Sequence, residues 1–136
     1  MKMAPYWLAV LAVLPLSVAA APFSMPEFGQ LPGSKAWSNK VELADLNGDG
    51  ATDILFANGR GYASAGGGER NTVLFNPNGA EQPWADQSNL IFGKQLDQRR
   101  AIKVRDFDQD GNLDIFVANS FQTQSRYYRG VGPGLY

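Results

Sequence analysis

The feature that most constrains this chain is an internal repeat built around two acidic segments. The segment "DLNGDGATD" occupies residues 45–53, and "DFDQDGNLD" occupies residues 106–114. The offset is 61 residues, since Asp45 aligns with Asp106, and the match extends without a gap over residues 41–59 and 102–120. A repeat of about sixty residues predicts stacked units, because each unit buries a face against its neighbour.

The hydrophobic pattern within each unit is that of strands. Apolar residues alternate with polar or small ones at Val41 and Leu43, and again at Ile102 and Val104. This period of two indicates a half-buried strand with its apolar members facing the interior. The intervening positions, predicted to face away from it, are Glu42, Ala44, Lys103 and Arg105.

Short runs rich in β-forming residues follow each acidic segment. "DILFA" and "DIFVA" suit buried strands, and residues 72–75 and 126–128 predict a third strand in each unit. A fourth strand is expected within residues 84–92, and no sustained helical period is present. The predicted fold is all-β, with about two β-propeller-type repeat blades that form an incomplete propeller.

The N-terminus has the pattern of an export signal. Lys2 precedes an apolar run, and small residues around Ala20 satisfy a signal-peptidase site, so residues 1–20 are predicted to be a signal peptide. The run is shorter than the ~20 residues of a membrane-spanning helix and contains Pro15, so no stable membrane insertion is expected after cleavage. The protein is predicted to be secreted or extracytoplasmic, in the periplasm or on the cell surface. Residues 21–136 form the repeat region, with repeat one at about 28–91 and a truncated repeat two at about 92–136.

The composition excludes several kinds of functional site. The chain contains neither cysteine nor histidine, which excludes disulfides, thiolate zinc sites, cysteine nucleophiles and histidine bases. Twelve basic residues nearly balance 13 acidic ones, so binding of nucleic acid is not indicated. The clustered carboxylates all lie in the two acidic segments, so we expect no catalytic residue, no organic cofactor and no enzymatic activity.

The acidic segments instead have the spacing of calcium loops. Calcium takes six to eight oxygen ligands at about 2.3–2.6 Å, and alternate residues of a curled loop direct oxygens to one centre. Gly50 and Gly111 supply the sharp turn at position 6. Two Ca²⁺ sites are predicted, with ligands from side chains at positions 1, 3, 5 and 9 and from the backbone carbonyl at position 7. These ligands are Asp45, Asn47, Asp49, Ala51 and Asp53 in the first site, and Asp106, Asp108, Asp110, Asn112 and Asp114 in the second.

An EF-hand, a plain hairpin turn and a magnesium site each fit the acidic segments less well. An EF-hand requires a bidentate Glu at position 12, where this chain has Phe56 or Val117. A simple Asp-Gly hairpin turn accounts for one such dipeptide but not for four oxygen-bearing side chains repeated at the same spacing. Magnesium prefers a tighter octahedron that keeps several waters, so a cage with many carboxylates suits calcium better.

The loop pattern, entered by an alternating strand and followed by "DILFAN" or "DIFVAN", resembles the FG-GAP/VCBS repeat family. The segment "YYRGVGPGLY" at residues 127–136 is similar to a further motif of that family. The resemblance implies β-propeller blades of the type found in the integrin α-subunit head. It also implies calcium at the positions given above and no catalytic role.

Two repeats are fewer than the 4–8 blades of a closed propeller. We therefore expect either that the sequence is a piece of a longer chain or that copies self-associate. The favoured function is a non-enzymatic module that binds a protein or glycan, and the alternatives are the N-terminal part of an enzyme or an adhesion scaffold. The glycine-rich segment 59–70 is expected to be a mobile surface loop. Aromatic residues that could stack on sugars, or simply fill the core, are Trp37, Tyr62, Trp84, Phe121, Tyr127 and Tyr128.

Overall fold

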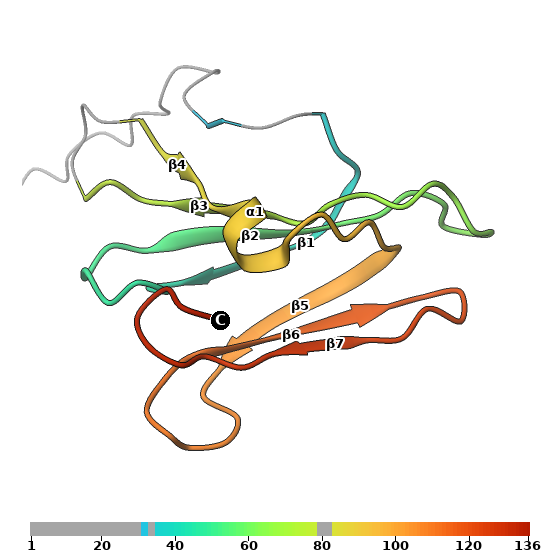
Figure 1. Cartoon of the computed structure of the whole chain (residues 1–136). Helices are drawn as coiled ribbons and strands as arrows, with labels where there is room; N and C mark the ends of the chain where they lie inside the picture. The colour runs from blue at the N-terminus through green and yellow to red at the C-terminus, as the bar shows by residue number, and fades with distance from the viewer. Residues whose placement is uncertain (1–30, 33–34, 79–82) are drawn as a thin grey trace, which may run out of the picture.

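The computed structural model describes residues 31–32, 35–78 and 83–136. It contains two antiparallel sheets that stack face to face, as Figure 1 shows. The predicted signal peptide and the start of repeat one lie outside the described residues. The first sheet has the strand order β1-β2-β3-β4, and the second has the order β5-β6-β7. The predicted all-β class is therefore confirmed, and the described sheets do not close into a ring.

Each sheet is a meander whose strands follow one another along the chain. The first sheet contains β1 (Ser38–Ala44), β2 (Asp53–Asn58), β3 (Thr72–Phe75) and β4 (Ala85–Asp86). The second contains β5 (Arg99–Arg105), β6 (Asp114–Asn119) and β7 (Arg126–Tyr128).

A short helix, α1 (Ser88–Phe92), connects the two sheets. The strand predicted within residues 84–92 is β4, and α1 occupies most of the remainder of that segment, where it buries Ile91 and Phe92. No helix in the described part of the chain has the length and apolarity needed to cross a membrane.

The repeat in sequence is also a repeat in register. Leu43 pairs with Ile54 in the first sheet, and Val104 pairs with Ile115 at the matching position of the second. Both sheets carry an irregularity at the start of their first strand. Loop one (residues 45–53) joins β1 to β2, and loop two (residues 106–114) joins β5 to β6, so each loop sits at the same end of its sheet.

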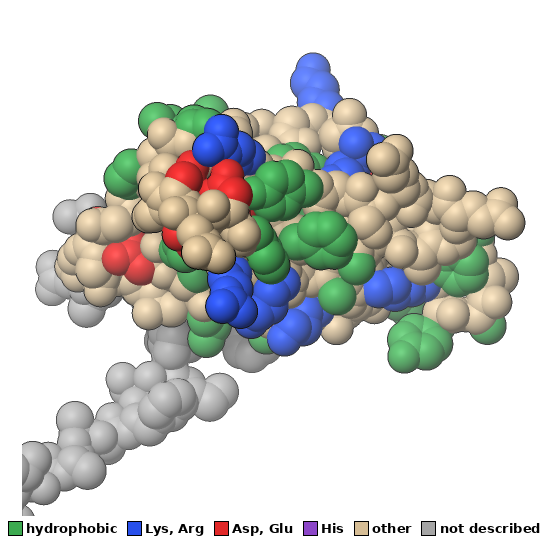
Figure 2. Space-filling model, turned by 90° about the horizontal axis from the view of Figure 1, so that it is seen from below, with side chains coloured by type: hydrophobic (Ala, Val, Ile, Leu, Met, Phe, Trp, Pro, Cys, Tyr) green, Lys and Arg blue, Asp and Glu red, His purple; other side chains and the backbone are tan. Residues whose placement is uncertain are grey.

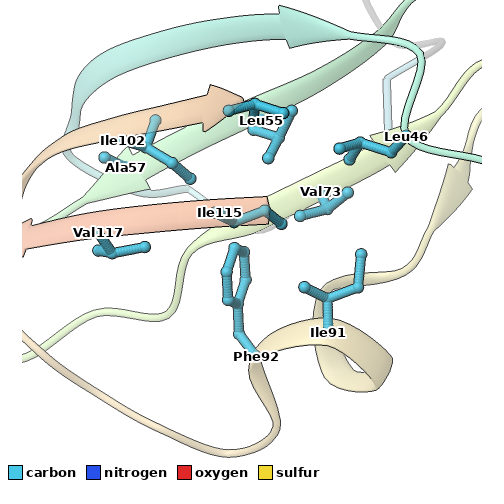
Figure 3. Packing of buried hydrophobic residues seen from close by; sticks show 10 residues of the cluster. Leu46, Leu55, Ala57, Val73, Ile91, Phe92, Ile102, Ile115 and Val117 are labelled. Atoms are coloured by element: carbon cyan, nitrogen blue, oxygen red, sulfur yellow. The ribbon is translucent and has the colours of Figure 1, made fainter. Parts of the chain in front are cut away.

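The hydrophobic core lies between the two sheets. Leu55, Ala57 and Val73 of the first sheet meet Ile115 and Val117 of the second, and all five side chains are fully buried. Figure 3 shows Ile91 and Phe92 of α1 approaching the same cluster from the side. Burying a side chain of this size contributes about 1.5–3 kcal/mol, so the contact between repeats is the main source of stability.

One prediction from the alternation is wrong, because the apolar side chains of β1 point away from the second sheet. Val41 and Leu43 are 46% and 61% exposed, whereas Glu42 is buried. Glu42 accepts hydrogen bonds from Lys103 Nζ at 2.6 Å and from the Val104 amide at 3.5 Å. Burial alone would raise the pKa of Glu42, but these contacts outweigh it and hold the pKa below its usual value. The alternation is real, but the side that faces the second sheet is the one carrying Glu42.

The glycine-rich segment is tied to the rest of the fold at its end. Glu69 forms an ion pair with Arg60 at 2.6 Å and an antiparallel bridge with Asp97, which precedes β5. Asp97 in turn accepts hydrogen bonds from Arg99 and Arg126. The insertion in repeat one is therefore anchored on the second repeat, next to the fully buried Arg99 side chain.

Candidate metal centres in the two acidic loops

The first aspartate of each loop organises the turn through backbone amides. Asp45 accepts hydrogen bonds from the amides of Gly48, Asp49 and Gly50 at 2.8–3.1 Å. Asp106 accepts them from the amides of Asp110 and Gly111 at 3.2 and 2.9 Å.

Position 6 turns as the motif requires. Gly50 and Gly111 have φ values of 85° and 90°, in the left-handed region that residues with a Cβ avoid. Both loops therefore curl around the side chain at position 1.

The aspartate at position 9 joins each loop to its sheet. Asp53 accepts hydrogen bonds from the amides of Leu46 and Asn76, at 2.8 and 2.9 Å. Asp114 repeats this arrangement with the amides of Phe107 and Gly130, both at 2.8 Å. Both carboxylates are fully buried. They close the loop onto the chain at the end of the third strand, a contact between distant parts of each repeat.

The pKa values of these two carboxylates shift in opposite directions. Burial raises the pKa of Asp53 and the charges of Asp49 and Asp45 add to the rise, which the amides of Asn76 and Leu46 only partly offset. Burial also acts to raise the pKa of Asp114, but the amides of Gly130 and Phe107 outweigh it and lower the pKa. In loop one, burial and the charges of Asp49 and Asp45 disfavour the ionised form of Asp53, and a cation there would relieve that cost.

The middle of loop one contains short local contacts and one contact from beyond the third strand. Asn47 Nδ2 donates to Asp49 Oδ2 at 2.9 Å, and Asp49 Oδ1 accepts from the Ala51 amide at 2.8 Å. Asn78 donates to the Asp49 carbonyl at 3.1 Å. Asp49 is exposed, so its carboxylate can turn to a cation without breaking a buried contact.

The side chain of Arg129 brings a positive charge to the middle of loop two. Arg129 donates to Asp108 Oδ2 through Nε at 2.7 Å and to Asp110 Oδ2 through Nη2 at 2.8 Å. Asp110 also accepts from the amide of Asn112 at 2.9 Å, and this bond with the charge of Arg129 holds the pKa of Asp110 below its usual value. In the first repeat, Phe75 takes the place of Arg129 at the end of the third strand.

Three of the four carboxylates of loop two converge on one point, and Asp110 is not among them. Oxygens of Asp106, Asp108 and Asp114 lie within 4.8 Å of one another, close enough to share one metal ion. The matching residues in loop one are Asp45, Asn47 and Asp53, with an amide oxygen in place of the central carboxylate. All of these donors are hard oxygens, the ligands that calcium prefers, so the residues fit the predicted ion.

The two loops lie side by side at one end of the molecule. A small cleft between them is lined by Asp45 and Leu46 of the first loop and by Asn112 and Leu113 of the second. The C-terminal segment completes the cleft, and its Gly134 amide donates to the Leu46 carbonyl at 2.7 Å.

Arg129 and the amides that hold position 9 were not foreseen from the sequence. Arg129 lies outside the nine-residue motif, and its only signal was its place in the "YYRG" segment. The amides of Asn76 and Gly130 leave no trace in the residue type, because every residue except proline carries one.

Replacing Arg129 by alanine is expected to tighten calcium binding at loop two by several fold. The guanidinium occupies oxygens of Asp108 and Asp110, so an incoming dication must displace or repel it. Isothermal titration calorimetry of Arg129→Ala measures the change.

Lys94→Ala is the control, because it removes one positive charge from a different cleft, shared with Glu69 and Leu96. Weaker binding in Arg129→Ala would mean that the arginine instead orients the two carboxylates for the ion.

A comparison with protein-family models places this geometry in a known family. The model described as FG-GAP-like repeat matches residues 45–117, more than half of the chain. The match runs from the first aspartate of loop one, through loop two and into β6. Neither the curated proteins nor the solved structures gave a match. The chain therefore belongs to the FG-GAP-like repeat family.

Proposed function

We propose that this protein is an exported, calcium-stabilised FG-GAP-like repeat protein that acts as a non-enzymatic binding module for a protein or glycan. The observation that carries the proposal is the convergence of Asp106, Asp108 and Asp114 in a loop that occurs twice. Bound calcium would supply positive charge that holds these carboxylates together. Each loop would then act as a clip that fixes one end of a sheet.

The proposal assigns one ion to each loop. In loop two, Asp106, Asp108, Asp110 and Asp114 would hold it, with the Asn112 carbonyl. In loop one, Asp45, Asn47, Asp49 and Asp53 would hold it, with the Ala51 carbonyl. Export fits this role, because millimolar calcium is characteristic of extracellular modules.

Two buried acidic residues outside the loops support a role without catalysis. Glu42 and Asp97, both buried, are held in ion pairs with lysine or arginine. With histidine and cysteine absent from the whole chain, the groups that most often act as bases and nucleophiles are missing.

Exposed aromatic rings support the binding role. Tyr62 and Trp37 are 92% and 65% exposed, and the guanidinium of Arg100 lies 5.4 Å from the ring centroids of both Tyr62 and Phe121. Such rings stack on sugars or on partner side chains at low entropic cost. Tyr128 is less suited, because it packs edge-on against the buried Phe92 at 5.1 Å. A glycan array probed with calcium present tests the glycan ligand, and an empty array removes that version of the proposal.

The metal assignment is tested by calorimetric titration of charge-removing variants. Asp45→Asn and Asp106→Asn keep one of the two oxygens that accept amide bonds of the turn, so circular dichroism of each variant first establishes that its fold is retained. We expect each single variant to bind one calcium ion fewer than the wild type, and the double variant to bind none.

Asp86→Asn, outside both loops, is the control and should titrate as the wild type does. The assignment is wrong if the double variant retains the calcium isotherm of the unaltered protein.

A further inference from the structure

The first sheet leaves an apolar face uncovered in the described structure. Val41 and Leu43 of β1 are 46% and 61% exposed, and Ile54 and Phe56, their partners on β2, are only half-buried. A soluble domain seldom leaves a row of four such side chains open unless the row contacts something.

The repeat shows what this face is built to contact. At the matching positions of the second sheet, Ile102 pairs with Val117 and Val104 pairs with Ile115. These side chains are 9% exposed or less, because they pack on the first sheet. The first sheet therefore exposes the same face that the second sheet buries.

The second sheet has the complementary open face. Phe107, Phe116 and Tyr127 are 42–47% exposed and touch edge-on, with ring centroids 6.3–6.5 Å apart. Figure 2 looks onto this side of the molecule, where hydrophobic and basic side chains lie beside a cluster of acidic ones. The matching residues of the first sheet are Leu46, Leu55 and Val73, which are buried against the second sheet. The described structure thus has two unlike open faces, which match the two halves of the interface between its own two sheets.

We infer that a second copy of this chain docks head to tail, with the Phe116 face of one copy on the Leu43 face of the next. The contact repeats the internal one between the two sheets, so the backbone shapes already match. Such an interface is heterologous: it forms a ring if the rotation between copies closes, and a filament otherwise. Rings of about two to four copies would contain the 4–8 blades of a propeller.

The positive charge of Arg105 favours the same arrangement. Within one chain, loop one and loop two lie side by side across the interface. Repeating that geometry between copies brings loop two of one copy beside loop one of the next. Arg105 is exposed on the Phe116 face directly before loop two, so its positive charge would enter this contact beside the acidic loop one of the neighbouring copy.

Sedimentation velocity across a wide range of protein concentration tests the inference on the purified chain. We expect the mass to rise to that of two or more copies. Leu43→Glu and Phe116→Glu should each remain monomeric, because each places a charge in one half of the interface. Both side chains are solvent-exposed in the single chain, so the variants should melt as the monomeric wild type does. Leu90→Glu, which changes an exposed apolar residue of α1 outside both faces, is the control and should associate normally.

Mixing the two variants gives the decisive result. Leu43→Glu retains an intact Phe116 face, and Phe116→Glu retains an intact Leu43 face, so the mixture should form a one-to-one pair. A symmetric contact between like faces gives no pair in this mixture and overturns the inference. A wild-type protein that stays monomeric at every concentration also overturns it, whether another segment of the chain or a different partner covers the faces.

Discussion

Removing calcium is expected to lower the free energy of unfolding by about 5 kcal/mol, relative to protein in calcium at about one hundred times the dissociation constant. At that excess, one ion stabilises the folded state by about 2.7 kcal/mol, and each of the two loops is proposed to hold one ion. The physical reason is the repulsion among carboxylates whose oxygens lie within 4.8 Å in loop two. Two such charges about 4 Å apart repel by roughly 4 kcal/mol at an effective dielectric constant near 20.

Urea unfolding with excess calcium and with excess chelator measures this difference. Magnesium at the same ionic strength is the matched control, because it screens charge equally but suits an all-protein cage of this kind poorly. Equal stabilisation by magnesium and by calcium would show that the stabilisation arises from charge screening alone. Identical unfolding curves with calcium and with chelator would show that calcium binding at the loops does not stabilise the fold.

The second large effect is expected from Asp97→Ala, which should lower the free energy of unfolding by about 3–5 kcal/mol. Asp97 Oδ2 accepts from Arg99 Nη2 at 3.2 Å and from Arg126 Nε at 2.7 Å. The Arg99 side chain is completely buried, so removing its carboxylate leaves an uncompensated charge in the interior. The pair also sits beside the bridge between Glu69 and Asp97 that joins the two repeats.

Two variants separate the ion pair from simple packing loss, both measured by urea unfolding. Arg126→Ala removes the outer, 37% exposed partner and should cost much less, since Asp97 keeps Arg99. Combining Asp97→Ala with Arg99→Met replaces both buried charges by apolar groups and should recover part of the lost stability. A double variant as unstable as Asp97→Ala would show that the cost does not arise from the unpaired charge.

The ion pairs of Asp97 also make the stability of the fold depend on pH. Burial acts to raise the pKa of Asp97, but the hydrogen bond from Arg126 and the charge of Arg99 outweigh it and hold the pKa below its usual value of 3.8. A carboxylate with a lowered pKa stabilises the fold above its unfolded-state pKa, and this contribution disappears as the pH falls through the folded-state value. Below that pH, wild type and Asp97→Ala should therefore converge in stability.

The strands and loops could be predicted because their signals are local. The third strands at Thr72–Phe75 and Arg126–Tyr128 lie where the β-prone runs placed them. The positive φ of Gly50 and Gly111 follows from the turn that the motif requires. Each of these features depends on residues close together in the sequence, which is why pattern and propensity were sufficient.

The side of β1 that faces the interior could not be predicted, because it depends on how the second sheet packs against the strand. Alternation shows that a strand has two faces but does not say which one meets the rest of the protein. In β5 the apolar residues face inward, while in β1 the inward residue is Glu42, whose charge is met by Lys103 of the second repeat. Contacts of this range, like that of Arg129 with Asp108 and Asp110, arise only when the two distant segments are brought together.

Both acidic loops are proposed to close around calcium, and the proposed stabilisation of the fold depends on it. Anomalous diffraction from crystals grown in millimolar calcium tests it most directly. We predict one anomalous peak in each loop, with carboxylate oxygens at about 2.3–2.6 Å from it. Loops that contain no peak, with Asp45 and Asp106 still bonded only to backbone amides, would contradict the claim.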